Sequence, residues 1–163
     1  MRSFDSLSSR VRIDPFEFIN LFNGNTALMV TMDKKGKCNV MALDWKKITE
    51  FNSNTVIRAQ VAYTRYTYTL LTEGVDEFTI NIPSEKIYDA VNIAGFYSGR
   101  NTNKIEMAKL KLIPGKSTNV PTLKDCILSY ECKIINDEKS EMSSHHYFYG
   151  KILNAYALED LKN

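Results

Sequence analysis

The sequence predicts a single domain that is mainly β with short helices (α+β), arranged as a closed or partly open β-barrel. The chain has 163 residues, of which 44% are hydrophobic and 25% charged, so one domain can bury a full core. Six segments have strand character, and the short helical segments between them do not alternate regularly with the strands. Long antiparallel segments at both ends of this order favour a barrel with helical insertions over a parallel α/β sheet.

The strands are predicted from alternation, β-branched residues and turn signals. In the segment 77–82, large apolar side chains alternate with Thr79 and Asn81, which predicts one face against a core. A turn rich in Asp, Lys and Gly separates the first two segments, and Gly150 marks a bend or bulge in the last one. The predicted strands are residues 26–32, 38–45, 55–61, 77–82, 127–135 and 146–158.

Helical spacing and capping residues predict four short helices. Asp14 is expected to cap the first of them, Pro15 suits its first position, and Gly24 ends it. Gly95 is expected to lie just after the end of the third. The other predicted helices are residues 64–72, 84–94 and 101–110, and residues 1–13 are expected to form an N-terminal arm or loop.

The composition argues against several classes of partner and location. The chain carries 21 basic and 19 acidic residues, a net charge of +2, which predicts neither a nucleic acid nor a membrane partner. Three cysteines without a CxxC motif predict free thiols in a reducing compartment. No apolar run has the length of a signal or membrane segment, so we expect a cytoplasmic protein. Rossmann, P-loop and GxSxG motifs are absent, and the Cys and His spacing predicts no metal site.

Two segments have the features of an anion site. In the first, Thr64, Arg65 and Thr67 lie at a predicted helix start, where free backbone N–H groups and the helix dipole favour a negative charge. An arginine in the first turn of a helix is electrostatically unfavourable unless it faces an anion. A capping threonine beside a solvated arginine explains the same residues equally well.

The second segment runs from Ser98 through Arg100 to Lys104. It combines a hydroxyl, a flexible glycine and two cations ahead of a predicted helix, which suits a phosphate. By itself this segment is better explained as an ordinary loop and helix cap. Two such segments in a chain of almost no net charge make a small phosphorylated ligand more credible, although neither identifies it.

Two further segments are less specific. The strand from Asn39 to Trp45 mixes an amide, small residues and the only tryptophan, which can contact a flat heterocycle. By itself it is better explained as a strand with an inward Trp45. His145 and His146 are better explained as a pair at the start of a strand, with one ring exposed, than as catalytic groups. No catalytic residue is assigned from the sequence.

The order of these segments resembles the flavin reductase-like, FMN-binding split-barrel family, in particular its flavoredoxin-like branch. The resemblance covers the chain from about residue 26 to about residue 158. It is carried by residues 39–45, 65–68, 77–83 and 98–100, by Lys104, and by residues 146–150. It implies one Greek-key split β-barrel domain over residues 1–163, a homodimer, and FMN bound near the subunit interface.

The resemblance also implies a set of FMN-binding residues in this sequence. Asn39, Met41, Ala42 and Trp45 would line the flavin ring. Arg65 and Thr67 would hold the phosphate or the ribityl chain, Asn81 would approach from the neighbouring strand, and Ser98, Arg100 and Lys104 would complete the phosphate clamp.

The strand that would contact the flavin departs from the family pattern at two positions. The family strand usually reads Met-Thr-x-Ser-Trp, whereas this chain has Ala42 and Asp44 in place of the two hydroxyl residues. A carboxylate of Asp44 facing the ring would disfavour the anionic reduced flavin and lower its potential. Alternatively, Asp44 faces away and pairs with Lys46 or Lys47.

The resemblance implies an FMN-dependent oxidoreductase, a flavin reductase or flavoredoxin-type protein. Electrons from a nicotinamide (NADH or NADPH) or a redox-protein donor would pass through bound FMN, with the flavin supplying the chemistry. Three alternatives stay open. They are a non-catalytic FMN carrier, a split-barrel relative with another ligand such as pyridoxine phosphate or haem, and a barrel that has lost its ligand.

Overall fold

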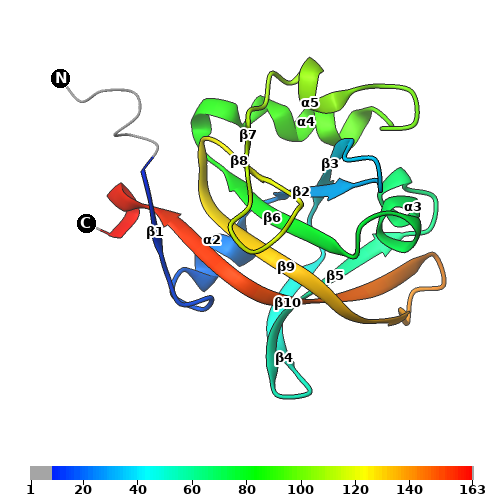
Figure 1. The fold of residues 1–163 in the computed structure, drawn as a ribbon, viewed down its shortest axis with the longest axis horizontal. Helices are drawn as coiled ribbons and strands as arrows, with labels where there is room; N and C mark the ends of the chain where they lie inside the picture. Colours follow the sequence, from blue (N-terminus) through cyan, green and yellow to red (C-terminus); the bar gives the residue numbers. More distant parts are fainter. Residues whose placement is uncertain (1–8, 163) are drawn as a thin grey trace.

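The computed structural model describes residues 9–162, and in this range one antiparallel sheet of eight strands forms the body of the molecule (Figure 1). The strands are β1 (Arg10–Arg12), β2 (Ala27–Met32), β3 (Cys38–Leu43), β4 (Lys46–Phe51), β5 (Asn54–Ala62), β6 (Glu77–Pro83), β9 (Cys126–Lys139) and β10 (His145–Leu158). A separate ribbon pairs β7 (Leu112–Ile113) with β8 (Thr122–Leu123). The helices are α2 (Ile19–Gly24), α3 (Tyr66–Glu73), α4 (Asp89–Phe96) and α5 (Lys104–Met107), with 3-10 turns at Glu85–Ile87 and Glu159–Lys162.

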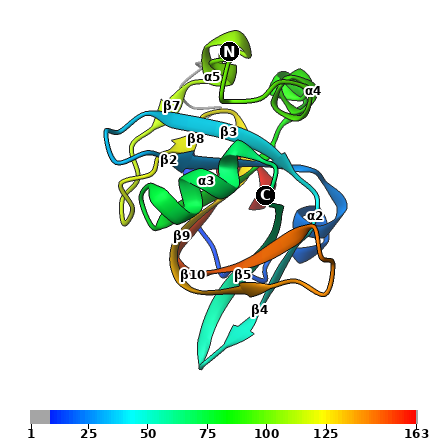
Figure 2. The same ribbon diagram turned by 90° about the vertical axis from the view of Figure 1, so that its right-hand side faces the viewer.

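The sheet curls into a barrel that is split at one corner. Its order is β3-β2-β6-β9-β10-β5-β4, with β1 paired beside β10, so the two ends of the sheet are strands that follow each other in sequence. Only Asp44 and Trp45 separate these two strands. Among residues 9–162 no ladder joins β3 to β4, and the Trp45 carbonyl instead accepts a hydrogen bond from the Gln60 N–H (2.9 Å). Figure 2 shows β2 and β3 above this opening and β4 and β5 below it.

Alternation along the strands builds apolar clusters on both faces of the sheet. On β6, Phe78, Ile80 and Ile82 belong to the main core inside the barrel, together with Phe22 of α2. On the other face, helices α4 and α5 cover the alternate residues of β2 and β3, such as Val30. The predicted alternation of residues 77–82 is therefore confirmed.

Two buried carboxylates fix the loop before β8. Glu131 Oε1 accepts hydrogen bonds from the backbone N–H groups of Ser117 (2.7 Å) and Thr118 (3.1 Å). Glu77 Oε1 accepts from Asn119 (2.8 Å) and Val120 (3.4 Å) in the same way. Because four consecutive backbone donors face two anions, this loop, which we term the acid clasp (Glu77, Glu131 and residues 117–120), is held by charge-assisted hydrogen bonds.

The six predicted strands are all present, with small shifts at their ends. The structure adds β4, β7 and β8, which the sequence did not predict, and it corrects the expected arm. Arg10–Arg12 is a strand, in which Val11 pairs with Ala157 of β10. The rest of the arm prediction concerns residues 1–8, which lie outside the described residues, and residues 9 and 13, which are irregular. No helix in the range 9–162 is long and apolar enough to cross a membrane.

Three of the helix predictions need correction. The first helix begins at Ile19, because Asp14 Oδ1 accepts from the Phe16 N–H (2.9 Å) in a turn instead of capping a helix. Gly95 lies inside α4, which runs to Phe96. The segment 101–110 contains only the four-residue helix α5, capped by Asn103, whose side chain accepts from the Glu106 N–H (3.1 Å).

The bend in the last strand lies at Gly150, as predicted. The pairing of β10 with β9 shifts register between Tyr149 and Gly150, and again between Ile152 and Asn154. A Cβ atom on Gly150 would lie 2.3 Å from Phe78 Cζ in the core. The strand can therefore cross the core at this point only with a glycine.

Candidate functional site

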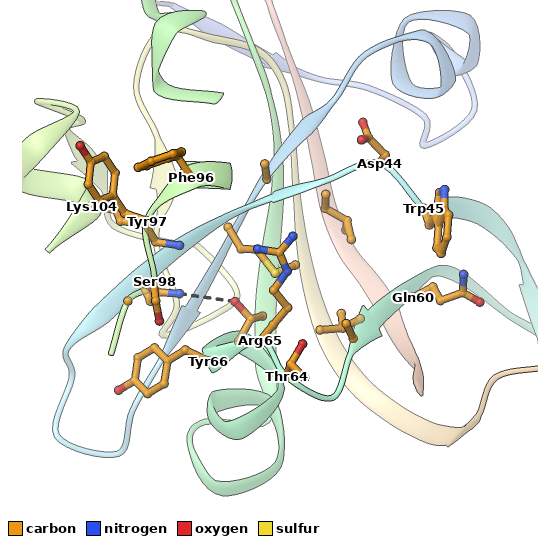
Figure 3. Close-up of a pocket in the computed structure, with 18 of the residues that line it drawn as sticks. Asp44, Trp45, Gln60, Thr64, Arg65, Tyr66, Phe96, Tyr97, Ser98 and Lys104 are labelled. Atoms are coloured by element: carbon orange, nitrogen blue, oxygen red, sulfur yellow. Dashed lines mark hydrogen bonds between the residues drawn. The ribbon is translucent and has the colours of Figure 1, made fainter. Parts of the chain in front are cut away.

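A cavity of about 600 Å³ lies at the split corner of the barrel, a size within the range of small-molecule sites. Its walls come from β3 with the corner that follows it, the end of β5 with the start of α3, and the end of α4 with the loop that follows it (Figure 3). The lining residues are Asn39, Met41, Ala42, Leu43, Asp44, Trp45, Gln60, Val61, Ala62, Thr64, Arg65, Tyr66, Thr67, Phe96, Tyr97, Ser98, Gly99, Lys104 and His145.

One side of the cavity carries two cations without an anion. Lys104 is only 4% exposed, and its Nζ donates to the carbonyl oxygen of Ala94 (3.1 Å). Burial, and secondly the nearby Arg65 guanidinium, lower the pKa of Lys104 to about 8. Among the described residues no carboxylate forms an ion pair with Lys104 or Arg65. A buried ammonium group beside a guanidinium is unfavourable by itself, so this side of the cavity is built for an anionic ligand.

Arg65 lies directly before α3, where it occupies the N-cap position with extended backbone dihedrals. No side chain caps this end of the helix, and the Tyr68 N–H donates to the Arg65 carbonyl (3.0 Å), which leaves at most the N–H groups of Tyr66 and Thr67 for another acceptor. Thr67 is buried, and its hydroxyl lies 3.4 Å from the Nδ2 of Asn39, which donates to it. The capping threonine of the alternative explanation is therefore wrong, whereas Arg65 is exposed, as that alternative expected. The helix end adds its dipole to the two cations.

The loop after α4 brings Ser98 to the cavity but not Arg100. The Arg100 guanidinium turns away, donating from Nη1 to the Thr64 carbonyl oxygen (3.1 Å) and lying 5.6 Å from the centre of the Tyr66 ring. A Cβ atom on Gly99 would lie 2.1 Å from Asn39 Oδ1, so only a glycine lets this loop approach β3. Arg100 thus fastens the loop to the start of α3 instead of lining the cavity.

Exposed aromatic side chains lie at two sides of the cavity. Trp45 is 49% exposed, and its ring centre lies 5.0 Å from that of His145, so the expectation of an inward tryptophan is wrong. Phe96 is 81% exposed and packs edge-to-face on Tyr97 at 4.9 Å. Figure 3 shows Trp45 on one side of the cavity and the Phe96–Tyr97 pair on the other. A flat ring between them would contact aromatic and amide groups.

Asp44 lines the aromatic part of the cavity. Its carboxylate accepts a hydrogen bond from the Thr26 hydroxyl. Lys46, the partner considered from the sequence, donates instead to the carbonyl oxygen of Asn25 (2.7 Å). Burial lowers the pKa of Lys46, and the nearby Asp44 carboxylate opposes this shift. Asp44 therefore lines the cavity without a close ion pair to Lys46, and its carboxylate is hydrogen-bonded to Thr26, which is not a lining residue.

The structure does not bring Asn81 to the cavity. This side chain is fully buried behind β2, where its Nδ2 donates to the carbonyl of Leu28 (3.1 Å). Its Oδ1 accepts from the Leu123 N–H (3.2 Å) and from the Ser129 hydroxyl (2.9 Å). With its polar atoms occupied in the core, Asn81 joins the loop at residue 123 to the sheet, which is a structural role.

The lining also contains residues that the sequence interpretation did not assign to the site, among them Gln60, Phe96, Tyr97 and His145. The aromatic pair directly before Ser98 was a usable signal, because large exposed aromatic residues beside a polar loop indicate a binding surface. His145 and His146 lie at the start of β10, as expected, but both are half-buried, so the expected exposed ring is not found. His145 lines the cavity, whereas His146 Nε2 lies 2.7 Å from Asp137 Oδ1. The described residues contain no cluster of three metal-ligating side chains.

Comparison with known proteins identifies the family. The model of the flavin reductase like domain matches residues 20–163. The chain belongs to the flavin reductase-like family. The family is one of flavin-related oxidoreductases, and the predicted relationship to it is therefore confirmed.

Individual relatives agree with this assignment. Flavoredoxin of Desulfovibrio vulgaris (Miyazaki F) is 29% identical, with a TM-score of 0.73 over 83% of this chain and 70% of its own. The FMN-binding domain of a flavin reductases-like enzyme from Shewanella baltica has a TM-score of 0.76 at 18% identity, covering 93% of this chain and 78% of its own, and shares the fold. An uncharacterized protein of Archaeoglobus fulgidus is 33% identical over 118 residues, 72% of this chain. This match spans 64% of the Archaeoglobus protein. The split-barrel fold class predicted from the sequence is confirmed.

Proposed function

We propose that the protein binds FMN in this cavity and acts as a flavin reductase or flavoredoxin-type oxidoreductase. The observation that carries the proposal is the buried Lys104 beside Arg65, at a helix start, in a family of flavin proteins. A phosphate group supplies the two negative charges that this side of the cavity lacks. Gly99 lets the loop pack directly against Asn39 and Tyr66, which supports the position of Ser98 at the cavity.

The residues present fit the parts of FMN in a definite order. Lys104, Arg65 and Ser98 would hold the phosphate, and Thr67 and Asn39 lie beside them for the ribityl chain. The part of β3 from Met41 to Trp45 would line the ring, with Trp45 and Phe96 at the two sides of the mouth. Arg100 would act indirectly, by fixing the loop that carries Ser98.

Bound FMN would supply the redox chemistry by accepting and passing on two electrons. The side chains of the chain have the task of binding, orientation and charge. Asp44 places a negative charge at the ring side, which disfavours extra negative charge there. Such a reaction does not need a carboxylate, histidine or thiol as a nucleophile. The proposed activity is therefore compatible with a site in which no catalytic residue is assigned.

The electron donor would be a nicotinamide, NADH or NADPH, or a redox protein. We further propose a homodimer and a cytoplasmic location. The exposed Phe96, Tyr97 and Trp45 around the mouth support a second subunit near the site, because exposed aromatic groups of this size are uncommon unless a ligand or another chain covers them.

FMN titration tests binding directly. Purified protein should be yellow or turn yellow with FMN, and should quench FMN fluorescence with a dissociation constant of about 1 µM or below, while riboflavin should bind more weakly because it lacks the phosphate. Colourless protein without saturable quenching contradicts the proposal. Mixing the FMN-bound protein with NADH and then with NADPH in a stopped-flow instrument tests catalysis. Rapid bleaching supports a reductase, and bleaching with neither points to a protein donor or to a carrier.

A further inference from the structure

A second cavity of about 510 Å³ lies next to the first. It is formed where the tip of the β9–β10 hairpin meets the start of α3, and the Tyr63 N–H donates across this junction to the Ser144 carbonyl (3.0 Å) (Figure 1). Its lining residues are Tyr63, Tyr68, Lys139, Ser140, Ser143, His145 and His146. His145 lines both cavities, so the two sites share one wall.

The second cavity has flat aromatic walls. Tyr63 and Tyr68 pack edge-to-face with ring centres 5.0 Å apart, and the His146 ring lies 5.7 Å from Tyr63 and 5.8 Å from Tyr68. These faces suit a small planar ring, which prefers offset or edge-to-face packing at such distances.

The imidazole of His146 is fixed at both nitrogen atoms. Its Nε2 lies 2.7 Å from Asp137 Oδ1, and its Nδ1 lies 3.1 Å from the Tyr63 hydroxyl. The His146 side chain is only 12% exposed. Because the chain Asp137–His146–Tyr63 is complete, the aromatic wall is rigid before any ligand arrives, which lowers the entropy that binding loses.

The charge in the second cavity is positive. Lys139 supplies an ammonium group, it has no carboxylate partner within the described chain, and none of the lining residues is acidic. In the β9–β10 register, Lys139 is opposite His146 and therefore shares its face, while Glu138 is opposite Tyr147 on the other face. There the carboxylate of Glu138 accepts a hydrogen bond from the Tyr149 hydroxyl. Asp137 shares the face of Lys139, but its carboxylate lies 2.7 Å from His146 Nε2 and it does not line the cavity. The exposed Lys139 is therefore the one lysine, arginine or acid among the lining residues.

We propose that the second cavity binds a small planar aromatic anion, of the aromatic carboxylate class, with its ring on Tyr63, Tyr68 and His146 and its carboxylate at Lys139. The proposal concerns a site separate from the FMN site and is independent of whether FMN binds. If FMN does bind, the shared wall at His145 places the aromatic anion beside the flavin site.

The test is a titration of flavin-free protein with benzoate, and with benzamide as its neutral analogue. Trp45 is the only tryptophan and packs on His145, so its fluorescence reports binding, and calorimetry gives the affinity independently. We expect saturable benzoate binding at least tenfold tighter than benzamide binding. Lys139→Gln should weaken benzoate binding about tenfold, which corresponds to about 1.4 kcal/mol.

Two variants serve as controls. Lys151→Gln removes an exposed lysine of β10 that lines neither cavity, and should leave benzoate binding unchanged. Arg65→Gln removes a cation of the first cavity, and should also leave it unchanged. Absence of saturable benzoate binding, equal affinity for benzamide, wild-type affinity of Lys139→Gln, or loss of binding in Arg65→Gln would each overturn the proposal.

The same samples are titrated with FMN to separate this inference from the proposed function. Benzoate binding that depends on Lys139, in a protein that does not bind FMN, supports the second site and rejects the proposed function. FMN binding without benzoate binding supports the proposed function and rejects the second site.

Discussion

Glu131 and Lys104 are both buried charges, but their surroundings differ. The Glu131 carboxylate, 1% exposed, faces the backbone N–H groups of Ser117 and Thr118 in the acid clasp. Lys104, 4% exposed, has one carbonyl oxygen and a neighbouring guanidinium. The pKa values of Glu131 and Lys104 reflect these different surroundings. Burial raises the pKa of Glu131, but hydrogen bonds from Ser117 and other donors outweigh it and leave the pKa below its ordinary value. A buried charge with its complement stabilises the fold, whereas a buried charge without one indicates a ligand site.

The largest effect is expected on stability. Glu131→Ala leaves the Ser117 and Thr118 N–H groups without an acceptor and should lower the free energy of unfolding by about 3 kcal/mol, measured by urea denaturation. Glu73→Ala, at an exposed carboxylate of α3, is the matched control and should change it by less than about 0.5 kcal/mol. If Glu131→Ala lowered the free energy of unfolding no more than the control does, Glu131 would not stabilise the fold, and its contrast with Lys104 would be wrong.

The clasp also predicts a direction for pH dependence. Since the folded-state pKa of Glu131 is lowered, the unfolded state binds the proton more readily, and stability is gained above the ordinary pKa of a glutamate and lost as pH falls through the folded value. Unfolding free energies of the wild type measured between about pH 3 and pH 7 should fall on acidification. The unfolding free energy of Glu131→Ala should fall less over this pH range. If it falls as much as that of the wild type, other groups cause the loss of stability in acid.

For Lys104 the expected effect is on binding and not on stability. Lys104→Met should weaken FMN binding by about 2 kcal/mol, roughly 30-fold, because a charge-assisted hydrogen bond to phosphate is lost. Riboflavin binding should not change. The flavin-free variant should be as stable as the wild type or more stable, since an uncompensated charge leaves the interior. A variant that loses both stability and riboflavin binding would show that Lys104 has a structural role like that of Glu131.

The pKa of about 8 at Lys104 predicts a further difference. A bound phosphate raises this pKa, so FMN affinity should be highest where the ammonium is already charged and should fall about tenfold between about pH 7 and pH 9. Riboflavin affinity should be flat over this range, as should FMN affinity in Lys104→Met. A pH-independent difference between FMN and riboflavin would mean that Lys104 stays charged throughout.

The smallest expected effect concerns the aromatic side of the cavity. Asp44→Asn removes a carboxylate that lines the site but is exposed, so screening limits its influence to about 0.5 kcal/mol. The two-electron midpoint potential of bound FMN should rise by about 10 mV, measured by dye-linked reduction. Glu50→Gln on β4 is the control and should leave the potential unchanged. A lower potential in Asp44→Asn would contradict the sign.

The sequence predicted most where side chains alternate strictly or where charges gather at a helix start. Arg65, Ser98 and Lys104 lie together in the cavity as expected, because each is placed by its own local element. β4 was missed because its sequence, Lys46–Phe51, is an edge strand with few buried residues and gives only a weak apolar pattern. Edge strands depend on the neighbour that pairs with them, which a local pattern does not contain.

Asn81 and Arg100 show a different limit of the sequence. Alternation placed Asn81 on the correct face of β6. The β8 segment covers that face, and the Leu123 N–H of β8 donates to Asn81. A local pattern around residue 81 cannot contain this contact, because Leu123 lies far along the chain. Arg100 was assigned from its charge in a loop ahead of a helix and from the family resemblance. The direction of its long side chain is set by the Thr64 carbonyl, which α3 places beside the loop. Residue type and spacing therefore predicted the chemistry of the site, whereas tertiary contacts decided which side chains reach it.

The split corner at Asp44 and Trp45 has a mechanical consequence. β3 and β4 end the sheet on either side of it, and in the described chain no backbone ladder crosses between them. A molecule that touches Trp45 on one side and Lys104 on the other would act as a clamp across this seam. We therefore expect amide hydrogen exchange to slow on both β3 and β5 when the first cavity is filled, with β9 at the centre of the sheet unaffected.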